Sequence, residues 1–342
     1  MPSAPSPPQV LCLGEALVDR LGPLSGDPAT DSPGDDRLGG APANGACALA
    51  RLGTPVAFVG RLGRDGIGQA FGQLFAAREV DTTALQWDDA RPSRIVLVRR
   101  DAAGDRQFGG FAGDRGEGFA DQALDATALA AAFGPLLAAA RWLLVGTIPL
   151  ASPAAASALQ LACRQAAAAG VPLALDVNWR PTFWDAATDP RSGPTAAQVT
   201  ATAPLLTQAA LIKCAREEAE WFFGSSDPVV VSASLPQRPE VVVTDGGAPL
   251  RWCFGGFSGE LPGFRVPVVD TTGAGDAFTA GLLHGLLHNP WQDEAHNGWH
   301  HQLEQRLRFA SACGALVCQA AGAIDPQPTA AAVQAFLAAR QG

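Results

Sequence analysis

Short apolar runs alternate with longer amphipathic or alanine-rich segments along most of this chain. The runs have the length of buried strands and the longer segments have the length of helices, so the pattern predicts a repeated βα succession. We expect strands at 10–13, 56–59, 142–145, 172–177, 211–213 and 241–244, and helices at 44–52, 68–78, 123–140, 153–169 and 216–223. This alternation is typical of a mostly parallel, doubly wound α/β sheet with helices on both faces, whose ligands bind beyond the carboxyl ends of the strands.

Other segments depart from this rhythm. Residues 94–100 and 106–108 flank the turn-forming stretch Ala102-Ala103-Gly104-Asp105, which predicts a β-hairpin on one side of the core. The segments 186–200 and 288–301 are polar or rich in breakers, and we expect them to be loops.

Composition narrows the classes of partner and compartment. The net charge of −9 argues against nucleic acid or an acidic membrane surface as a partner. Seven scattered cysteines with no CxxC pair favour reduced thiols, and no apolar run is long enough to span a membrane. The first nine residues, MPSAPSPPQ, lack the basic and apolar regions of a signal peptide and are expected to be a disordered tail. We therefore expect a cytoplasmic protein.

A turn of small residues precedes an apolar run late in the chain. It reads Asp270-Thr271-Thr272-Gly273-Ala274-Gly275-Asp276, and the run 277–281 that follows is expected to be a buried helix. Free backbone N–H groups and the helix dipole at such a turn form an anion site. A carboxylate there repels the anion unless it takes a proton from a group that attacks the anion, so Asp276 predicts phosphoryl transfer to a hydroxyl. The alternative is that the turn only caps the helix.

A second glycine motif lies near the N-terminus. Gly39-Gly40-Ala41-Pro42-Ala43-Asn44 precedes the expected helix 44–52, and Gly60-Arg61-Leu62-Gly63-Arg64-Asp65-Gly66-Ile67-Gly68 follows the expected strand 56–59. Adjacent glycines let a polyol approach bare backbone, and the amide of Asn44 can donate to and accept from sugar hydroxyls. The alternative here is a turn followed by a helix cap.

Together the motifs resemble the two signatures of the ribokinase-like (PfkB) carbohydrate kinase family, DTTGAGD and GG-x-x-x-N-x-A followed by G-x-x-G-x-D-x-x-G. They occur in the family's order, and the resemblance covers residues 10–326. It implies a ribokinase-like domain with a small β lid built from segments 15–38 and 91–113. It also implies a sugar kinase that uses ATP and Mg²⁺, with K⁺ as a further cation.

The resemblance assigns roles to single residues. Asp276 is expected to be the base, with an anion hole formed by the N–H groups of Gly273, Ala274 and Gly275. The expected sugar contacts are Asp19, Gly39, Gly40, Asn44 and Arg180. The expected nucleotide contacts are Thr244, Gly246, Thr271 and Ser311. Glu218 is expected to orient magnesium-bound water, and the expected monovalent-cation site consists of Asp270, Thr272 and Gly322.

Two positions depart from the family pattern. Ala215 stands where members often carry the Asn of Asn-x-x-Glu, and it cannot hydrogen-bond a phosphate or its water. Ser311 stands where ribokinase-type members place an Asn near the adenine. These departures leave the affinity for MgATP and its regulation open, while the base and the anion hole are retained.

The acceptor is suggested by two further stretches. Gly14-Glu15 with Asp19 resembles fructokinases, and Asp176-Val177-Asn178-Trp179-Arg180 with Trp184 resembles fructokinases and 2-keto-3-deoxygluconate kinases. Fructose is therefore the leading acceptor, and 2-keto-3-deoxygluconate, ribose and nucleosides are alternatives. A catalytically silent, sugar-binding regulator is an alternative of another class. Phe108 and Phe111 could close over the sugar or pack a homodimer through the lid.

All five histidines lie within 18 positions, between His284 and His301. His284 and His288 share a helix face at a spacing that can bind zinc, but no HExxH motif is present. A solvated loop that contains His296, His300 and His301 is the default expectation.

Overall fold

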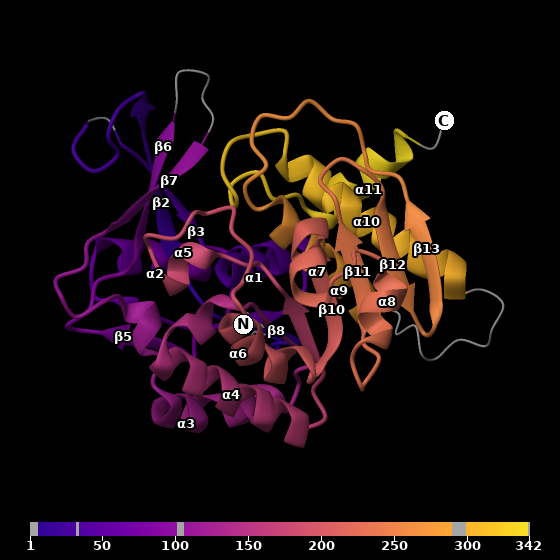
Figure 1. The fold of residues 1–342 in the computed structure, drawn as a ribbon, viewed down its shortest axis with the longest axis horizontal. Helices are drawn as coiled ribbons and strands as arrows, with labels where there is room; N and C mark the ends of the chain where they lie inside the picture. Colours follow the sequence, from indigo (N-terminus) through magenta and orange to yellow (C-terminus); the bar gives the residue numbers. More distant parts are fainter. Residues whose placement is uncertain (1–5, 32–33, 101–105, 289–298, 341–342) are drawn as a thin grey trace, which may run out of the picture.

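One large sheet crosses the whole molecule (Figure 1). The computed structural model describes residues 6–31, 34–100, 106–288 and 299–340. Within them, the strand order of the sheet is β13 (Phe257–Leu261), β12 (Leu250–Phe254), β11 (Glu240–Thr244), β10 (Ala209–Ala215), β9 (Leu173–Asp176), β8 (Trp142–Val145), β1 (Val10–Leu13), β4 (Val56–Gly63) and β5 (Leu85–Asp88). The strands from β11 to β5 are parallel, and β12 and β13 add an antiparallel edge. The predicted mostly parallel α/β sheet is confirmed.

Helices cover both faces of this sheet. The first face carries α3 (Ala126–Leu137), α4 (Pro153–Ala168), α6 (Ala196–Leu206), α7 (Arg216–Phe223) and α8 (Pro228–Ala233). The second face carries α1 (Ala41–Leu52), α2 (Gly66–Ala77), α9 (Ala274–His288) and α10 (Trp299–Val317), with α11 (Ala330–Ala338) against α10. Short helical turns complete the fold: η1 (Ala120–Ala123), η2 (Ile148–Ala151) and α5 (Pro181–Trp184).

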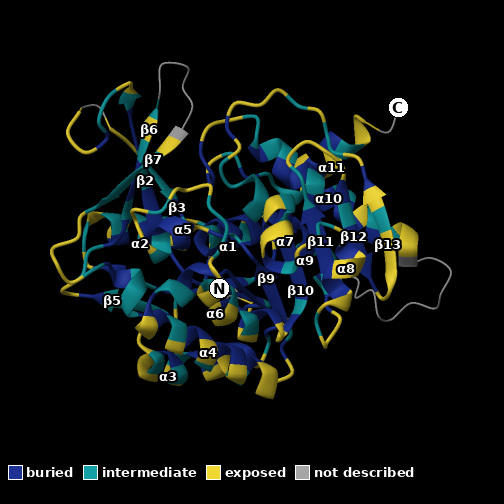
Figure 2. Ribbon diagram, in the orientation of Figure 1, coloured by how far each residue is buried: buried dark blue, intermediate teal, exposed yellow. Residues whose placement is uncertain are grey.

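The central strands are mostly apolar, and β1 and β8 are apolar along their whole length, because both faces of the sheet are covered. In β1, Leu11 and Leu13 join the core on one face, and Val10 and Cys12 join the core on the other. Figure 2 shows the central strands buried and the outward surfaces of the helices exposed. None of the described helices is long and apolar enough to cross a bilayer.

A separate four-stranded sheet forms the lid. Its order is β3 (Asp35–Gly39), β2 (Leu17–Leu24), β6 (Ile95–Arg100) and β7 (Arg106–Ala112). The β2–β6 pair is parallel, and the other two pairs are antiparallel. The predicted hairpin is confirmed as β6 and β7, and its turn at 101–105 lies outside the described residues.

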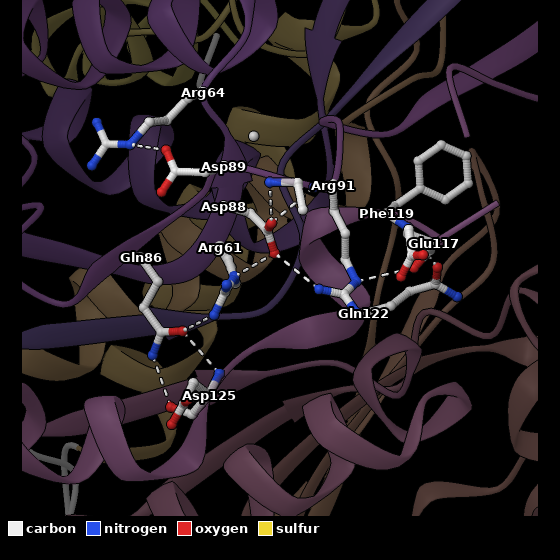
Figure 3. Close-up of polar contacts among 12 residues, drawn as sticks. Arg61, Arg64, Gln86, Asp88, Asp89, Arg91, Glu117, Phe119, Gln122 and Asp125 are labelled. Atoms are coloured by element: carbon white, nitrogen blue, oxygen red, sulfur yellow. Dashed lines mark hydrogen bonds and ion pairs between the residues drawn. The ribbon is translucent and has the colours of Figure 1, made fainter. Parts of the chain in front are cut away.

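A polar network fastens the base of this lid to the edge of the main sheet (Figure 3). Asp88, the last residue of β5, accepts from Nε of Arg61 at 2.9 Å and from the backbone N–H groups of Ala90 and Arg91. Arg91 also donates from Nε to the carbonyl oxygen of Glu117 at 3.0 Å. The network therefore joins the chain that enters the lid to the chain that leaves it.

A buried ion pair lies beside this network. The Nε of Arg94 donates to Asp121 at 2.8 Å, and the two side chains are only 4% and 6% exposed. The Arg94 guanidinium also lies 4.4–4.8 Å from the ring centroids of Phe111, Phe119 and Phe183. These rings come from the lid and from the main body, so Arg94 joins the two parts.

Replacing Asp121 with Asn is expected to destabilise the fold by about 3–5 kcal/mol, because the change leaves a buried guanidinium without its counter-charge. Urea unfolding measures the change. The control is Asp89→Asn, which breaks an ion pair with Arg64 whose side chains are 61% and 83% exposed, and whose loss should cost less than about 1 kcal/mol. Equal effects of the two variants would contradict the role given to Arg94.

Several sequence expectations need correction. The segment 186–200 is not all loop, because α6 begins at Ala196 with Thr195 as N-cap and a Thr195–Gln198 capping box. The expected loop 288–301 is helical at both ends, in α9 and α10, and 289–298 lies outside the described residues. The expected tail is ordered at its end, since the carbonyl oxygen of Gln9 accepts from the backbone N–H of Arg141 at 2.7 Å.

Candidate active site

A cleft of about 530 Å³ lies between the lid and the main sheet. Asp19 and Phe108 line it from the lid. Lys213 lines it from the carboxyl end of β10, and Asn44 and Asp276 line it from the first turns of α1 and α9. This is the edge where a doubly wound sheet is expected to bind its ligand.

The two glycine motifs meet in this cleft. The Nδ2 of Asn44 donates to Oδ2 of Asp276 at 2.7 Å, although the residues are 232 positions apart in the chain. Asn44 is buried, and its Oδ1 has no hydrogen-bond partner among the described residues. An unpartnered buried amide oxygen is costly, so it is suited to accept from a ligand hydroxyl.

The electrostatics of the cleft act on Asp276. The pKa of its carboxyl is raised from 3.8 to about 6, mainly by burial and also by the negative charge of the neighbouring Asp176. Asn44, Lys213 and Arg180 act in the opposite direction. A carboxylate with a pKa near 6 is ionised at pH 7 and is a stronger base than an ordinary aspartate.

The turn before Asp276 requires glycine at its first position. Gly273 has φ +76°, and a methyl group placed on it would lie 2.6 Å from Cβ of Ala323. Gly273 and Gly275 line the cleft. The N–H of Ala274 instead donates to the carbonyl oxygen of Thr271 at 3.2 Å. The anion hole predicted from three N–H groups thus has one of them engaged within the turn.

The residues predicted to contact sugar lie together. Asp19, Gly40, Asn44 and Arg180 line the cleft. Gly39 is buried just behind it, where a methyl group would lie 3.3 Å from Oδ2 of Asp19. Gly40 has φ +100°, and a methyl group there would lie 2.7 Å from the carbonyl oxygen of Glu15.

The residues predicted to contact nucleotide and magnesium are more dispersed. Thr271 and Glu218 line the cleft beside Ala215. Glu218 is buried and accepts the N–H of Trp179 and the N–H of Ala215, each at 2.7 Å, with one carboxylate oxygen for each. Burial raises the pKa of Glu218.

Three other predicted residues lie outside the lining of this cleft. Thr244 pairs with Ala215 in the β10–β11 ladder, and Gly246 follows it with φ +54°. Ser311 lies on α10 and has a buried hydroxyl with no hydrogen-bond partner among the described residues.

The predicted monovalent-cation residues come together in space. Asp270 accepts from the N–H and the hydroxyl of Thr272 through Oδ1, at 3.0 and 2.7 Å. Its Oδ2 accepts from the N–H of Gly322 at 2.8 Å. The carboxylate of Asp270 therefore joins the backbone segment of Thr272 to that of Gly322.

Sequence reasoning missed a buried polar chain under the cleft. The Nζ of Lys213 lies 3.0 and 3.2 Å from the two carboxylate oxygens of Asp176, and Oδ2 of Asp176 also accepts from the hydroxyl of Thr279 at 2.8 Å. The sequence did hold a signal, because Lys213 is its one lysine and lies near the end of the apolar strand β10. Glu15 was also given no role, and burial raises its pKa to about 8.

The histidines do not form a metal site among the described residues. His284 lies in α9, where its Nδ1 is 2.7 Å from the hydroxyl of Thr54 and its ring stacks on Phe309. His300 lies at the start of α10 near Glu304, at 3.7 Å. The described residues contain no cluster of three or more His, Cys, Asp or Glu side chains that could hold a metal. His296 lies outside them.

Known proteins resemble this chain over nearly its whole length. The family model "pfkB family carbohydrate kinase" matches residues 7–330. The probable fructokinase-6, chloroplastic, of Arabidopsis thaliana is 33% identical over 96% of this chain and 82% of its own length. Fructokinase-2 of Zea mays is 32% identical over 96% of this chain and 94% of its own length.

Solved structures agree with this result. A fructokinase with bound ATP from Xylella fastidiosa has a TM-score of 0.81 at 28% identity, over 97% of this chain and 99% of that one. A fructokinase from Vibrio cholerae O395 in a fructose-, ADP- and calcium-bound form has a TM-score of 0.76 at 27% identity, with the same coverage. With both family signatures joined in one cleft, the chain belongs to the pfkB family of carbohydrate kinases.

Proposed function

We propose that the protein transfers the γ-phosphoryl group of MgATP to the primary hydroxyl of a sugar, with fructose as the leading acceptor. The observation that carries the proposal is the hydrogen bond between Asn44 and Asp276 in the cleft, since it places a sugar-binding amide beside a base. The similarity to fructokinases, one with bound fructose and ADP and another with bound ATP, supports the choice of substrates.

The reaction follows from the side chains of the cleft. Asp276 accepts the proton of the sugar hydroxyl. At the same time the hydroxyl oxygen of the sugar forms a bond to the γ-phosphorus, and the bond from that phosphorus to the oxygen of ADP breaks. The N–H groups of Gly273 and Gly275 face the phosphoryl oxygens and stabilise their charge. Phe108 lines the cleft from the lid, and closure of the lid over the sugar would exclude water.

The residues fit the magnesium that accompanies ATP. Each oxygen of Glu218 accepts one backbone N–H and keeps a second lone pair, so the carboxylate can accept from metal-bound water. Magnesium retains several waters and prefers oxygen ligands, and it offsets phosphate charge when bound. Ala215 contributes no side-chain ligand, so we expect the metal to be held mainly through water and phosphate.

The lid also bears on assembly. Phe111 packs against Phe119 and Phe183 within one chain, and Phe108 lines the cleft. Both positions favour a role of these side chains in closing over the sugar, and not in packing a homodimer. A homodimer through the lid is still a prediction, and light scattering of the purified protein tests it.

A second acceptor is favoured by Arg180. Its side chain is exposed and lines the cleft, and its NH1 donates to the carbonyl oxygen of Trp179 at 2.8 Å. A guanidinium with further N–H groups directed to the cleft could pair with the carboxylate of a sugar acid. We therefore retain 2-keto-3-deoxygluconate as the alternative substrate.

A coupled ADP-release assay with MgATP and K⁺ tests the proposal across fructose, glucose, ribose, 2-keto-3-deoxygluconate and adenosine. We expect the highest kcat/KM with fructose. A higher value with 2-keto-3-deoxygluconate that Arg180→Met abolishes would favour the alternative. No turnover with any acceptor, with sugar binding retained, would favour a regulator.

The raised pKa of Asp276 predicts an acid limb in the pH profile. The base must be ionised, so kcat/KM for the sugar should be constant above pH 7 and fall about tenfold per unit below pH 6. The other cleft carboxyl groups with raised pKa values are Glu15 and Glu218, and Glu15→Gln should leave the limb in place. Loss of the limb in that variant would assign it to Glu15 instead.

A further inference from the structure

We propose that Lys213 is a catalytic residue whose ammonium group binds the transferring phosphoryl group of a nucleoside triphosphate. This proposal rests on the proposed kinase function and adds a residue to it. The evidence is the position of the ammonium, which lies at the floor of the cleft and against the anion hole.

The geometry places the ammonium beside the glycine turn. Lys213 is 8% exposed and lines the cleft, and a methyl group placed on Gly275 would lie 3.0 Å from its Nζ. Glycine at 275 therefore leaves room for the ammonium next to the backbone that is expected to hold phosphate. Two N–H groups of the ammonium can point to the carboxylate of Asp176, and the third is available to a ligand.

The helix dipole at this position opposes a cation, and a bound anion would offset that repulsion. A cation near the N-terminus of a helix is repelled by the helix dipole, and α9 begins at Ala274. Burial lowers the pKa of Lys213, but the neighbouring Asp176 and Glu218 outweigh burial, so the pKa is raised and the group remains charged. A charged lysine is thus kept where a phosphate would remove the repulsion.

The charge balance of the cleft supports the same role. Among the described residues that line it, the acidic residues are Asp19, Glu218, Asp276 and Glu15, the last mostly protonated at pH 7 because its pKa is about 8, and the cations are Arg180 and Lys213. A polyphosphate would add more negative charge to this set. Arg180 is exposed, so Lys213 is the buried cation that can offset charge developing on the phosphoryl oxygens.

A purely structural ion pair is the competing explanation. Buried pairs can often be replaced by apolar residues of similar size without loss of stability. If Lys213→Met alone fails to fold, the double variant Lys213→Met with Asp176→Asn is expected to fold, because it removes both charges of the pair. If the pair had only a structural role, its loss would not change the affinity for the triphosphate relative to the affinity for the diphosphate.

The test measures binding and turnover together. Titration calorimetry compares the affinity for the imido analogue of ATP with the affinity for ADP, both with Mg²⁺, in the wild type and in each variant. We expect Lys213→Met, alone and in the double variant, to lose about 10- to 100-fold for the analogue and little for ADP. The kcat for the best acceptor should fall by a similar factor.

Arg180→Met is the matched control, since it removes the exposed cation of the same cleft. It should raise the KM for the sugar and leave the ratio of analogue to ADP affinity unchanged. An unchanged ratio in both lysine variants, or a kcat within threefold of wild type, would overturn the role of Lys213. Absence of turnover in the wild type would reject the kinase function separately, while the affinity ratio would still decide whether Lys213 binds the terminal phosphate.

Discussion

Replacing Asp276 with Asn should lower kcat by roughly 10²–10⁴-fold, because the variant has no base to accept the hydroxyl proton. The amide can still bond to Asn44, so the cleft should keep its shape. Affinity for ATP should therefore change little. Single-turnover measurements with saturating MgATP and sugar give the chemical step directly.

Stability separates loss of the base from damage to the fold. Burial raises the pKa of Asp276 in the folded state, so ionisation of this carboxyl lowers the free energy of unfolding, and the cost is fully present above pH 6. A neutral Asn removes that cost, and Tm at pH 8 should be equal to or higher than that of the wild type. The same substitution at the exposed Asp89 should leave kcat unchanged and should cost less than about 1 kcal/mol of stability. Near-wild-type turnover of Asp276→Asn would contradict the assignment of the base.

Replacing Gly273 with Ala should lower kcat/KM for MgATP by roughly 10²–10³-fold, the loss typical of removing one donor from an anion hole. The added methyl would lie 2.6 Å from Cβ and 2.8 Å from Cα of Ala323, and the residue has φ +76°. The turn must move to relieve this contact, and its N–H groups then lose their direction. Steady-state kinetics with varied MgATP measure the effect.

A matched control separates the contact from the backbone strain. Gly256 has φ +82°, and a methyl group there would meet nothing within 4 Å. Gly256→Ala should therefore cost only the strain, seen as a lower Tm with normal kinetics. Adding Ala323→Gly to Gly273→Ala removes the nearest contact and should recover part of the activity. An active Gly273→Ala variant would show that the turn does not hold phosphate.

The sequence was sufficient to predict the sheet, because strands covered on both faces are mostly apolar, as β1 is throughout. It also singled out Asn44 and Asp276, because the two glycine motifs that contain them together resemble the family signatures. The contact between these two residues depends on how α1 packs against α9 and could not be read from spacing. The same is true of Lys213 and Asp176, which lie on adjacent strands, β10 and β9, whose pairing is not local.

Other failures had a local signal that was overlooked. Thr195 and Gln198 form a capping box that marks the start of α6 inside a segment rich in breakers. The engagement of the Ala274 N–H within its own turn has no sequence signal, because it depends on the backbone angles of the turn.

The G-x-x-G-x-D-x-x-G stretch proves to have a structural use. A methyl group on Gly68 would lie 2.1 Å from the carbonyl oxygen of Gly63. Asp65 caps α2 through the N–H of Gly68 and accepts from the N–H and hydroxyl of Ser93, at 2.7 and 2.9 Å. Ser93 leads directly into β6, so this motif positions the lid at the cleft.

The hydrogen bond between Asn44 and Asp276 is expected to couple the evolution of the two signature motifs. Either partner has its orientation set by the other, so the fitness effect of a substitution at position 44 depends on the residue at position 276. Two segments separated by 232 residues in the chain are therefore not free to drift independently, and changes at these two positions are expected to be epistatic.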